Sequence, residues 1–469
     1  MKIVFEGNSR FDNSYGIVNL NLADALRRRG HRITLSSWDE NPEQLAISCA
    51  RLGIESFPIG SSDGADVCIR QFWPPNWERP NAQVFIVIQP WEFGGVPLEW
   101  VEALGQVDQV WAYTNFVKSC WVGAGADPRK IRVVPLGVRS PSIELPVKKP
   151  NQLLFLGGGI WRKGIDLFIR ALDNLEDDEL SDLSVVIKES GNNSFYQGQS
   201  LVDDLLRLYP RVGEVTQVLR ESLSRDDLDR LVAESQALVH PYRAEGFYLG
   251  GLEAMSLGTA VVLTRGGAAD DYANDTNATL INASIAISDQ PAVESYGPIG
   301  GTYHWLEVSI DDLSRGIREV RGDAVSLDRQ IKAGLATSTA FSWDQSASIA
   351  ERAIAGSFTG DVELDHFNGT EVLVARCLMG WGIDDLANAL GHLLTHHDIY
   401  GAAELLDLYQ GTLPDTALSL RNSLQAQIQS RIDLWEDARY RHYLRSFRVH
   451  RDADEAEGLN RICTRYPSV

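Results

Sequence analysis

The sequence predicts two doubly wound, Rossmann-like α/β domains followed by an α-helical extension. Two observations carry this prediction. Short apolar runs alternate with helical patterns over residues 1–140 and again over residues 151–340, which is typical of a parallel sheet covered by helices on both faces. Between them lies SPSIELPVKKP, residues 140–150, which contains three prolines and no periodicity. We expect this segment to be an interdomain linker.

The strands and helices of the two domains follow from these runs. In the first domain we expect a helix from Gly16 to residue 29 and strands at residues 2–5, 32–36, 67–70, 84–88 and 109–112. In the second we expect strands at residues 152–156, 183–188, 237–240 and 260–264, and helices at 165–175, 226–233 and 252–257. Ligands of such sheets bind at the carboxyl ends of the strands, so the cleft between the domains is the expected site.

The pattern becomes helical near residue 341. We expect a crossing helix at 341–356 and a helical extension at 360–469, in which leucines recur at helical spacing. The apolar positions of the extension need a partner. We therefore expect it to support self-association or to recruit an acceptor, separately from donor binding.

Composition excludes several classes of protein. The 469 residues include 43 Lys and Arg against 64 Asp and Glu, a formal net charge of −21. Such a chain is a poor binder of nucleic acid, which requires neutralisation of phosphates. No apolar run is long enough for a membrane span, and residues 1–5 are too short for a signal peptide. The five cysteines are scattered without a CxxC pair, so we expect a cytoplasmic protein.

The most informative motif is HPYRAEGFYLGGLEAMSLGTAVV, residues 240–262. It predicts a strand, a glycine-rich loop, a helix beginning near Leu249 and a further strand. The amino terminus of that helix offers free N–H groups and the positive end of a dipole, which suit a diphosphate. Glu245 in the loop and Glu253 in the helix offer carboxylates that accept hydrogen bonds from sugar and ribose hydroxyls. Surface glutamates of an ordinary βαβ crossover are the alternative interpretation.

Two further strand-to-helix turns carry candidate phosphate ligands. FLGGGIWRKGIDLFIRAL, residues 155–172, places Arg162 and Lys163 at a glycine-rich turn, where guanidinium and ammonium groups fit phosphate oxygens. The GxxxxGK[ST] pattern is absent, and a solvated basic turn is the alternative. The loop before Gly16 in GNSRFDNSYG can place backbone N–H groups against a phosphate, although a plain turn fits equally well.

Gln89, Trp91 and Glu92 directly follow an apolar strand in VIQPWEFGGVPLEW, residues 87–100. We expect them to line the cleft for the acceptor or the donor sugar, with a structural Trp-rich turn as the alternative. No HExxH, HxxxH or DxD ligand pattern stands at a suitable place, and we expect Asp270 and Asp271 to cap a helix. We therefore expect no protein-bound metal.

Together these motifs resemble the retaining glycosyltransferases of family 4 (the glycosyl transferases group 1 domain), which have the GT-B fold. The resemblance covers about residues 1–356 and also includes PRKIRVVPLGV, residues 128–138. It implies that Glu253 binds the nucleotide ribose, Glu245 the donor sugar and Lys163 the diphosphate, with Gly16 near the donor phosphate. It also implies that the loop residues Gly246, Phe247, Tyr248 and Leu249 bind the donor. A subgroup of the family is also resembled by residues 185–199, VVIKESGNNSFYQGQ, and this resemblance implies that Lys188 binds the donor.

The chain departs from the family at three places. It has Gly158 and Gly159 where an arginine is usual, EGFYLG where EGFGLP is usual, and Gln89 where many members have histidine. The resemblance implies a retaining, metal-independent transfer of a hexose from a nucleoside-diphosphate sugar, with Glu245, Lys163 and Arg162 in the catalytic group and no cofactor. A sugar-nucleotide epimerase and a non-catalytic scaffold of the same architecture are the alternatives. The acceptor, the base and the sugar are not specified.

Overall fold

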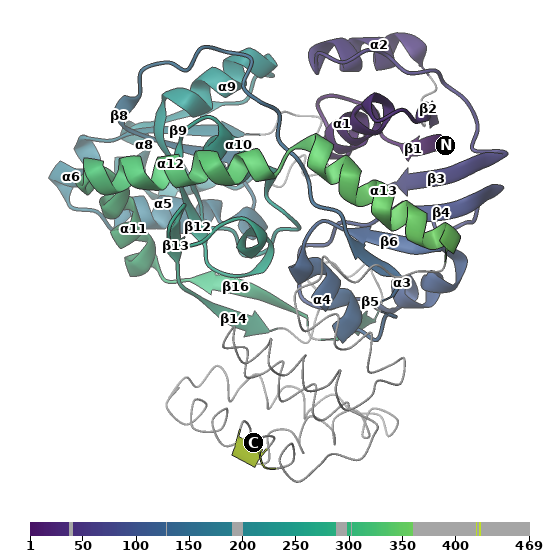
Figure 1. The fold of residues 1–469 in the computed structure, drawn as a ribbon. Coiled ribbons are helices and arrows are strands. Elements are labelled where there is room, and N and C mark those ends of the chain that lie inside the picture. Colours follow the sequence, from purple (N-terminus) through teal and green to yellow (C-terminus); the bar gives the residue numbers. More distant parts are fainter. Residues whose placement is uncertain are drawn as a thin grey trace.

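The computed structural model describes residues 1–36, 41–127, 129–189, 200–287, 298–301 and 303–359, together with positions 419, 422 and 423. Two six-stranded sheets organise these residues, each with helices packed against it, and they lie in two lobes (Figure 1). The predicted pair of Rossmann-like α/β domains is therefore confirmed. The expected helical extension at 360–469 lies outside the described residues except for those three positions.

The N-terminal lobe contains a parallel sheet with the strand order β2-β1-β3-β4-β6-β7. Its strands are β1 (Lys2–Gly7), β2 (Arg32–Ser36), β3 (Ala65–Gln71), β4 (Ala82–Ile88), β6 (Gln109–Ala112) and β7 (Ile131–Val133). Its helices are α1 (Ser14–Arg28), α2 (Pro42–Arg51), α3 (Leu98–Ala103), α4 (Asn115–Gly123) and the 3₁₀ turn η1 (Leu104–Gln106). The last five residues of β4 are all buried, as expected of a strand covered on both faces.

The C-terminal lobe repeats this arrangement with the strand order β10-β9-β8-β11-β12-β13. Its strands are β8 (Lys149–Gly157), β9 (Ser184–Glu189), β10 (Thr216–Leu219), β11 (Ser235–His240), β12 (Ala260–Thr264) and β13 (Thr279–Ile281). Its helices are α5 (Ile165–Asp173), α6 (Asp177–Ser181), α7 (Val202–Leu208), α8 (Pro210–Glu214), α9 (Arg225–Glu234), α10 (Leu249–Ser256), α11 (Ile310–Gly322) and α12 (Ala324–Ala340), with 3₁₀ turns η2 (Trp161–Lys163) and η3 (Gly267–Asp271). Strand β8 takes in the last two residues of the segment expected to be a linker.

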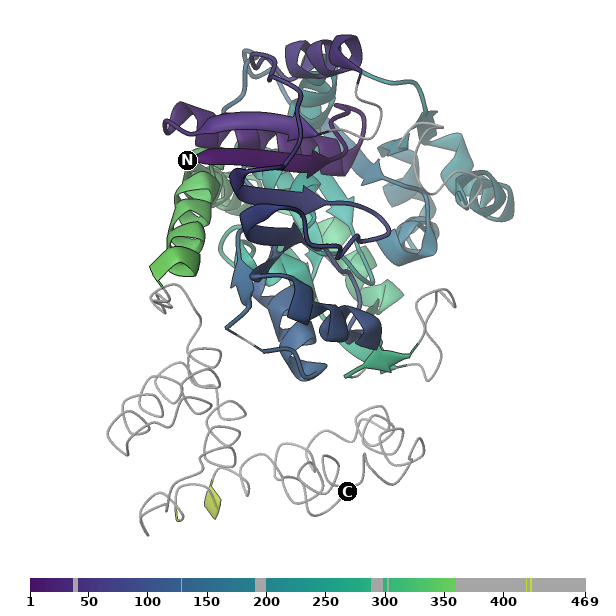
Figure 2. The same cartoon turned by 90° about the vertical axis from the view of Figure 1, so that its right-hand side faces the viewer.

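The chain passes between the lobes twice, and the two passages touch each other. Helix α13 (Trp343–Thr359) leaves the C-terminal lobe and packs along α1 of the N-terminal lobe, as Figures 1 and 2 show from two sides. It begins two residues after the start of the range expected for the crossing helix, 341–356, and ends three residues beyond that range. At the crossing, the Val138 N–H donates to the Phe341 carbonyl at 2.8 Å. A side chain at Gly137 would meet the Trp343 backbone, so the two passages approach as closely as a glycine allows.

Smaller antiparallel pairs add a second connection between the lobes. Strand β14 (Ala283–Ile287) pairs with β16 (His304–Val308), and β15 (Ile299–Gly300) pairs with β5 (Val96–Pro97) of the N-terminal lobe. The lobes are therefore joined on the β5 side as well as at the chain crossing.

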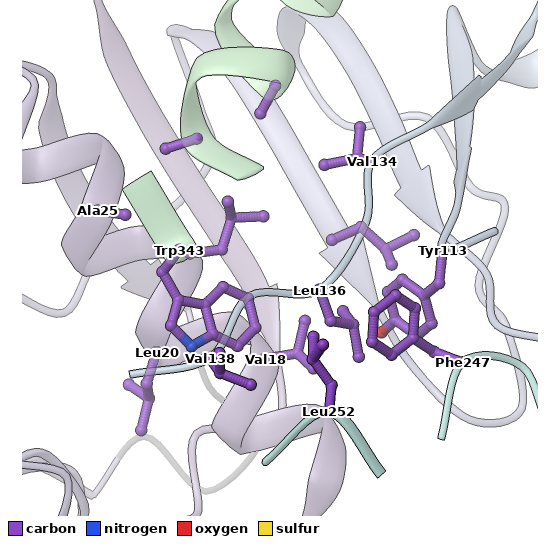
Figure 3. Close-up of a cluster of buried hydrophobic side chains, with 14 of the residues drawn as sticks. Val18, Leu20, Ala25, Tyr113, Val134, Leu136, Val138, Phe247, Leu252 and Trp343 are labelled. Atoms are coloured by element: carbon purple, nitrogen blue, oxygen red, sulfur yellow. The ribbon is translucent and has the colours of Figure 1, made fainter. Parts of the chain in front are cut away.

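One apolar cluster includes residues of both lobes. Figure 3 shows Val18 and Leu136 packed close to Leu252 and Phe247, which belong to the helix and loop after β11, with Trp343 on the opposite side of the cluster from Phe247. All five are nearly inaccessible to solvent. Burial of large apolar side chains contributes roughly 1.5–3 kcal/mol each. The loop that carries the candidate glutamate is therefore held against the N-terminal lobe by apolar packing.

Candidate active site

The candidate site lies at the switch point of the C-terminal sheet. Strand order runs outward from β8 through β9 and β10 on one side, and from β11 through β12 and β13 on the other. The loops after β8 and β11 therefore leave the sheet in opposite directions, and the space between their carboxyl ends is where such sheets bind ligands. The first loop carries Arg162 and Lys163, and the second carries Glu245.

Glu245 lies at the centre of this site. Its Oε1 is 2.5 Å from the Lys163 Nζ and its Oε2 is 3.3 Å from Arg162 Nη1. Burial alone would raise the pKa of this carboxyl, but the two cations outweigh burial and hold the pKa well below its ordinary value. The structure therefore brings the three predicted residues together around one ionised carboxylate.

His240, the last residue of β11, completes the cluster. Its Nε2 lies 3.2 Å from Glu245 Oε1, and burial lowers the pKa of the imidazole to about 4. A neutral imidazole beside a carboxylate carries its hydrogen on the facing nitrogen, so Nε2 donates and Nδ1 is left as an acceptor. Among the described residues, Nδ1 has no hydrogen-bond partner.

Tyr248 stands where the family usually has glycine, and its backbone is left-handed with φ +57°. The ring stacks on His240, and its hydroxyl donates to the Leu156 carbonyl at 3.3 Å. A Cβ placed on Gly250 or Gly251 would come within 3.0–3.3 Å of the ring. The ring therefore stands over the first turn of α10, between that turn and the end of β8.

Arg162 is turned inward. Its Nη1 donates to the Ala244 carbonyl at 2.6 Å, and its Nη2 lies 3.4 Å from Glu92 of the N-terminal lobe. It thus connects Glu92 with the Glu245 loop. Lys163 is the more exposed of the two cations, with 16% of its side chain accessible.

Glu253 projects from α10 and pairs with Arg225 of α9. The distance between Glu253 Oε1 and Arg225 Nη1 is 2.6 Å, and Arg225 also holds Asp229 at 2.8 Å. Hydroxyl groups that approach Glu253 therefore meet a carboxylate already fixed in orientation by a guanidinium.

The three predicted cleft residues of the N-terminal lobe differ in exposure. Gln89 and Trp91 are buried, with 0% and 2% of their surfaces accessible, whereas 27% of the Glu92 side chain is exposed. Trp91 packs on Trp100 with ring centroids 5.0 Å apart. Its backbone faces Gly246 so closely that a Cβ there would lie 2.9 Å from the Trp91 carbonyl oxygen.

The remaining predicted donor residues each have packing or hydrogen-bond contacts with nearby residues of the protein. A Cβ at Gly16, in the first turn of α1, would lie 2.1 Å from the Arg10 carbonyl, so glycine is needed there for packing of the preceding loop. Lys188 donates from Nζ to the Glu189 carbonyl at 2.6 Å, and burial lowers its pKa.

In the loop after β11, Phe247 packs on Tyr272, and Leu249 is the first residue of α10. Gly246 accepts a hydrogen bond from Thr114 of the N-terminal lobe at 3.2 Å.

The sequence motifs do not predict a role for His240 or Arg225, or the cross-lobe contact of Asp271. Asp271 accepts hydrogen bonds from the backbone and side-chain nitrogens of Asn115, the first residue of α4, at 3.0 and 3.2 Å. Its carboxylate thus faces the start of a helix, as expected, but the helix belongs to the other lobe. The sequence does contain a signal for His240, because this histidine ends an apolar strand five residues before the loop glutamate Glu245.

The described residues contain neither a cluster of metal ligands nor a membrane-spanning helix. No three His, Cys, Asp or Glu side chains among them are grouped as metal ligands would be. Within the same part of the chain, no helix has both the length and the apolar composition needed to cross a bilayer.

Comparison with known proteins agrees with this geometry. Residues 140–288, which include both candidate loops, match the family described as glycosyl transferases group 1. No curated protein matches the chain in sequence.

Solved structures show the same fold over most of the chain. A glycosyltransferase from Rickettsia africae is 14% identical, with a TM-score of 0.56, and covers 77% of this chain and 99% of its own. Sucrose-phosphate synthase from Thermosynechococcus elongatus is 12% identical, with a TM-score of 0.55 and coverage of 77% and 100%. The Anabaena protein HepE in complex with UDP and glucose is 14% identical, with a TM-score of 0.53 and coverage of 76% and 100%. At these identities the likeness establishes the fold.

Two parallel α/β lobes joined by a crossing helix therefore define a protein of the GT-B class. Within it, residues 140–288 belong to the glycosyl transferases group 1 family, family 4 of the glycosyltransferases. The predicted resemblance is confirmed.

Proposed function

We propose that this chain is a retaining glycosyltransferase that moves a hexosyl group from a nucleoside-diphosphate sugar to an acceptor hydroxyl, without a protein-bound metal or other cofactor. The observation that carries the proposal is the Lys163–Glu245 pair at the switch point of the group 1 domain, with α10 beginning beside it. The UDP and glucose in the Anabaena structure support a donor of this kind.

The chemistry follows from charge. Cleavage of the anomeric carbon–oxygen bond leaves a nucleoside diphosphate whose negative charge grows in the transition state, and fixed cations and dipoles stabilise such charge. Lys163 supplies an ammonium group, and the first turn of α10 supplies N–H groups and the positive end of its dipole. Arg162 acts here through Glu245 and Glu92, because its guanidinium is bonded internally.

The carboxylates serve recognition in this proposal. Glu245 is ionised and accepts hydrogen bonds from donor-sugar hydroxyls, while Glu253 accepts them from the ribose. Because the acceptor hydroxyl attacks from the face that the leaving group vacates, no side chain is required as a nucleophile. Glu92 has the most exposed side chain of the three predicted cleft residues and therefore has the best access to an acceptor.

One observation favours a catalytically degenerate scaffold, whose donor site is closed, as the second candidate. The Tyr248 ring stands over the turn of α10 that a diphosphate would approach, and the Gly246 backbone lies against Trp91. A protein whose site stays filled by its own side chains would bind no donor. Nucleotide binding therefore separates the two candidates.

Calorimetric titration with UDP, GDP and ADP tests the proposal. We expect one of the three to bind, and Lys163→Ala to weaken that binding by roughly 1.5–3 kcal/mol, the range of a hydrogen bond to a charged group. Lys332→Ala is the matched control, because this exposed lysine on α12 also pairs with a carboxylate, at 2.7 Å. Equal affinity of Lys163→Ala and the unmodified chain would refute the role of Lys163. Absence of any binding would favour the non-catalytic candidate.

The domain division forms part of the proposal. Residues 1–140 supply the acceptor side, residues 151–340 the donor side, and α13 closes the fold. We assign residues 360–469 to self-association or acceptor recruitment, because leucines recur there at helical spacing and such apolar positions need a partner.

A further inference from the structure

We propose that the hinge between the lobes, formed by the two chain passages that meet at Val138 and Phe341, carries a second binding site for a hydroxyl-rich monophosphate such as a sugar phosphate. The site is a cavity of about 340 Å³. One wall comes from α1, another from the passage around Arg139, and a third from the start of α13 around Asp344. This inference does not depend on the proposed transferase activity.

Arg139 is the cation that calls for an anion here. Its side chain is half-buried, and burial lowers the pKa of its guanidinium. Among the described residues it forms neither a hydrogen bond nor an ion pair. A guanidinium withdrawn from water without a partner is costly, and a bound phosphate, which it can engage with two N–H groups, would remove that cost.

The carboxylates of the cavity are already compensated. Asp24 pairs with Arg27 at 2.5 Å and with Arg28 at 3.1 Å, and Asp344 pairs with Arg29 at 3.3 Å. The cavity is lined by two cations and two carboxylates, and among the described residues Arg139 is the lining cation that lacks a direct ion pair, although Asp24 acts on it electrostatically. Arg225 is near enough to depress the pKa of Arg139 further. The N–H groups of Arg139, which donate no hydrogen bond among the described residues, are therefore the feature of the cavity that favours an anion.

The other groups of the cavity suit hydroxyls. Asn21 is 3% exposed, and its Oδ1 has no hydrogen-bond partner among the described residues, while its Nδ2 donates to the Ile17 carbonyl at 2.7 Å. Ser342 and the carboxylate of Asp344 also line the cavity. A volume of about 340 Å³ lies in the range of small-molecule pockets, roughly 300–1,000 Å³, and exceeds what a bare phosphate needs.

The position of the cavity lets a bound ligand stabilise one arrangement of the two lobes. Its walls include both chain passages, which are bonded to each other through Val138 and Phe341. A ligand that contacts both passages and α1 stabilises the arrangement of the lobes seen here. Arg225, which pairs with Glu253 at 2.6 Å, is close enough to Arg139 to lower the pKa of its guanidinium.

Calorimetric titration with glucose 6-phosphate tests this inference, with glucose and inorganic phosphate as comparison ligands. We expect glucose 6-phosphate to bind, Arg139→Gln to weaken it at least tenfold, and Ser140→Phe to abolish it by filling the cavity. Arg315→Gln, which removes an exposed arginine of α11, is the matched control and should bind as the unmodified chain does. Lys163→Ala should also bind normally, which separates the hinge from the candidate active site.

Three results would overturn the inference: no binding of glucose 6-phosphate, equal affinity in Arg139→Gln, or loss of binding in Lys163→Ala alone. If inorganic phosphate binds as tightly as glucose 6-phosphate, the sugar hydroxyls contribute nothing to binding, and the proposal of a hydroxyl-rich ligand is wrong. If Arg139→Gln does not fold, Ser140→Phe decides, because Ser140 is exposed and its substitution leaves every charge in place.

Discussion

The imidazole of His240 and the ring of Tyr248 lie parallel, with centroids 3.6 Å apart and planes inclined by 1°. This stack holds Tyr248 in a left-handed backbone conformation, which costs an ordinary side chain about 1–2 kcal/mol. Contact between aromatic rings contributes roughly 0.5–1.5 kcal/mol. The Tyr272 hydroxyl adds a hydrogen bond to the Tyr248 carbonyl at 2.9 Å. A strained residue is thus fixed at the start of α10.

Removal of the Tyr248 ring should open the first turn of α10. We expect Tyr248→Gly to bind the nucleoside diphosphate about tenfold more tightly, because glycine adopts the left-handed conformation without strain and no stack has to be broken. Tyr248→Phe keeps the ring and loses only the hydrogen bond to Leu156, so its gain should be smaller. Calorimetry measures both affinities. Weaker binding by Tyr248→Gly would mean that the ring contacts the nucleotide.

His240 should stay neutral at every pH at which the protein is ordinarily studied. Burial lowers its folded pKa to about 4, against about 6.5 in the unfolded chain. Its contribution to stability is therefore complete above pH 6.5 and is lost as pH falls toward 4, by about 3 kcal/mol in all. NMR of ¹⁵N-histidine-labelled protein should show no titration of His240 between pH 5 and 8, with His240→Gln used to assign the signal. A midpoint near 6.5 would contradict this.

The alternation of apolar runs predicts nine of the twelve strands in the two sheets, because strands buried on two faces need continuous apolar residues, but it misses the short strands β7, β10 and β13. The same pattern places Lys163 and Glu245 at the ends of neighbouring strands, where the structure has them. Our sequence analysis assigns no element to residues 310–340, although Leu313, Ile317 and Val320 of α11 recur at helical spacing. In α12 the buried residues include Gly334 and Ser338, so its apolar pattern is weak.

The details of the site depend on contacts that local patterns do not contain. Arg162 reaches the Ala244 carbonyl across 82 residues, so a guanidinium expected to bind phosphate is used to fix a loop. Trp91 and Gln89 follow a strand, as a cleft residue would, but the opposing Gly246 loop buries Trp91. The stack of Tyr248 on His240 stabilises a backbone angle that tyrosine rarely adopts. These relationships are set by tertiary packing.

Turnover should persist when metal ions are removed. The proposal assigns stabilisation of the leaving diphosphate to Lys163 and α10 rather than to a divalent cation. Product formation from the donor that binds best should therefore continue in excess EDTA at a rate within about twofold of the untreated enzyme. Complete loss of turnover that manganese restores would show that a metal carries part of the diphosphate charge.

Asp271 should make the contact between the lobes sensitive to pH. Burial raises the pKa of its carboxyl to about 6, despite the hydrogen bonds from Asn115. An unfolded aspartate titrates near 3.9, so between about pH 4 and pH 6 the folded chain binds the proton more tightly. Stability therefore falls as pH rises through this window, by about 3 kcal/mol for this group, and the loss persists at neutral pH.

Asp271→Asn removes that charge and should raise the free energy of unfolding at pH 7.5 by about 1–3 kcal/mol, with little change at pH 4. The new amide also gives a donor to Asn115 Oδ1, which has no partner among the described residues. Urea unfolding at the two pH values measures the difference. Asp275→Asn is the control, since this exposed carboxylate pairs with Arg265, which lowers its pKa. Asp275→Asn should therefore not stabilise the protein at pH 7.5. If both variants stabilise it equally, the lower net negative charge explains the effect and the burial of Asp271 does not.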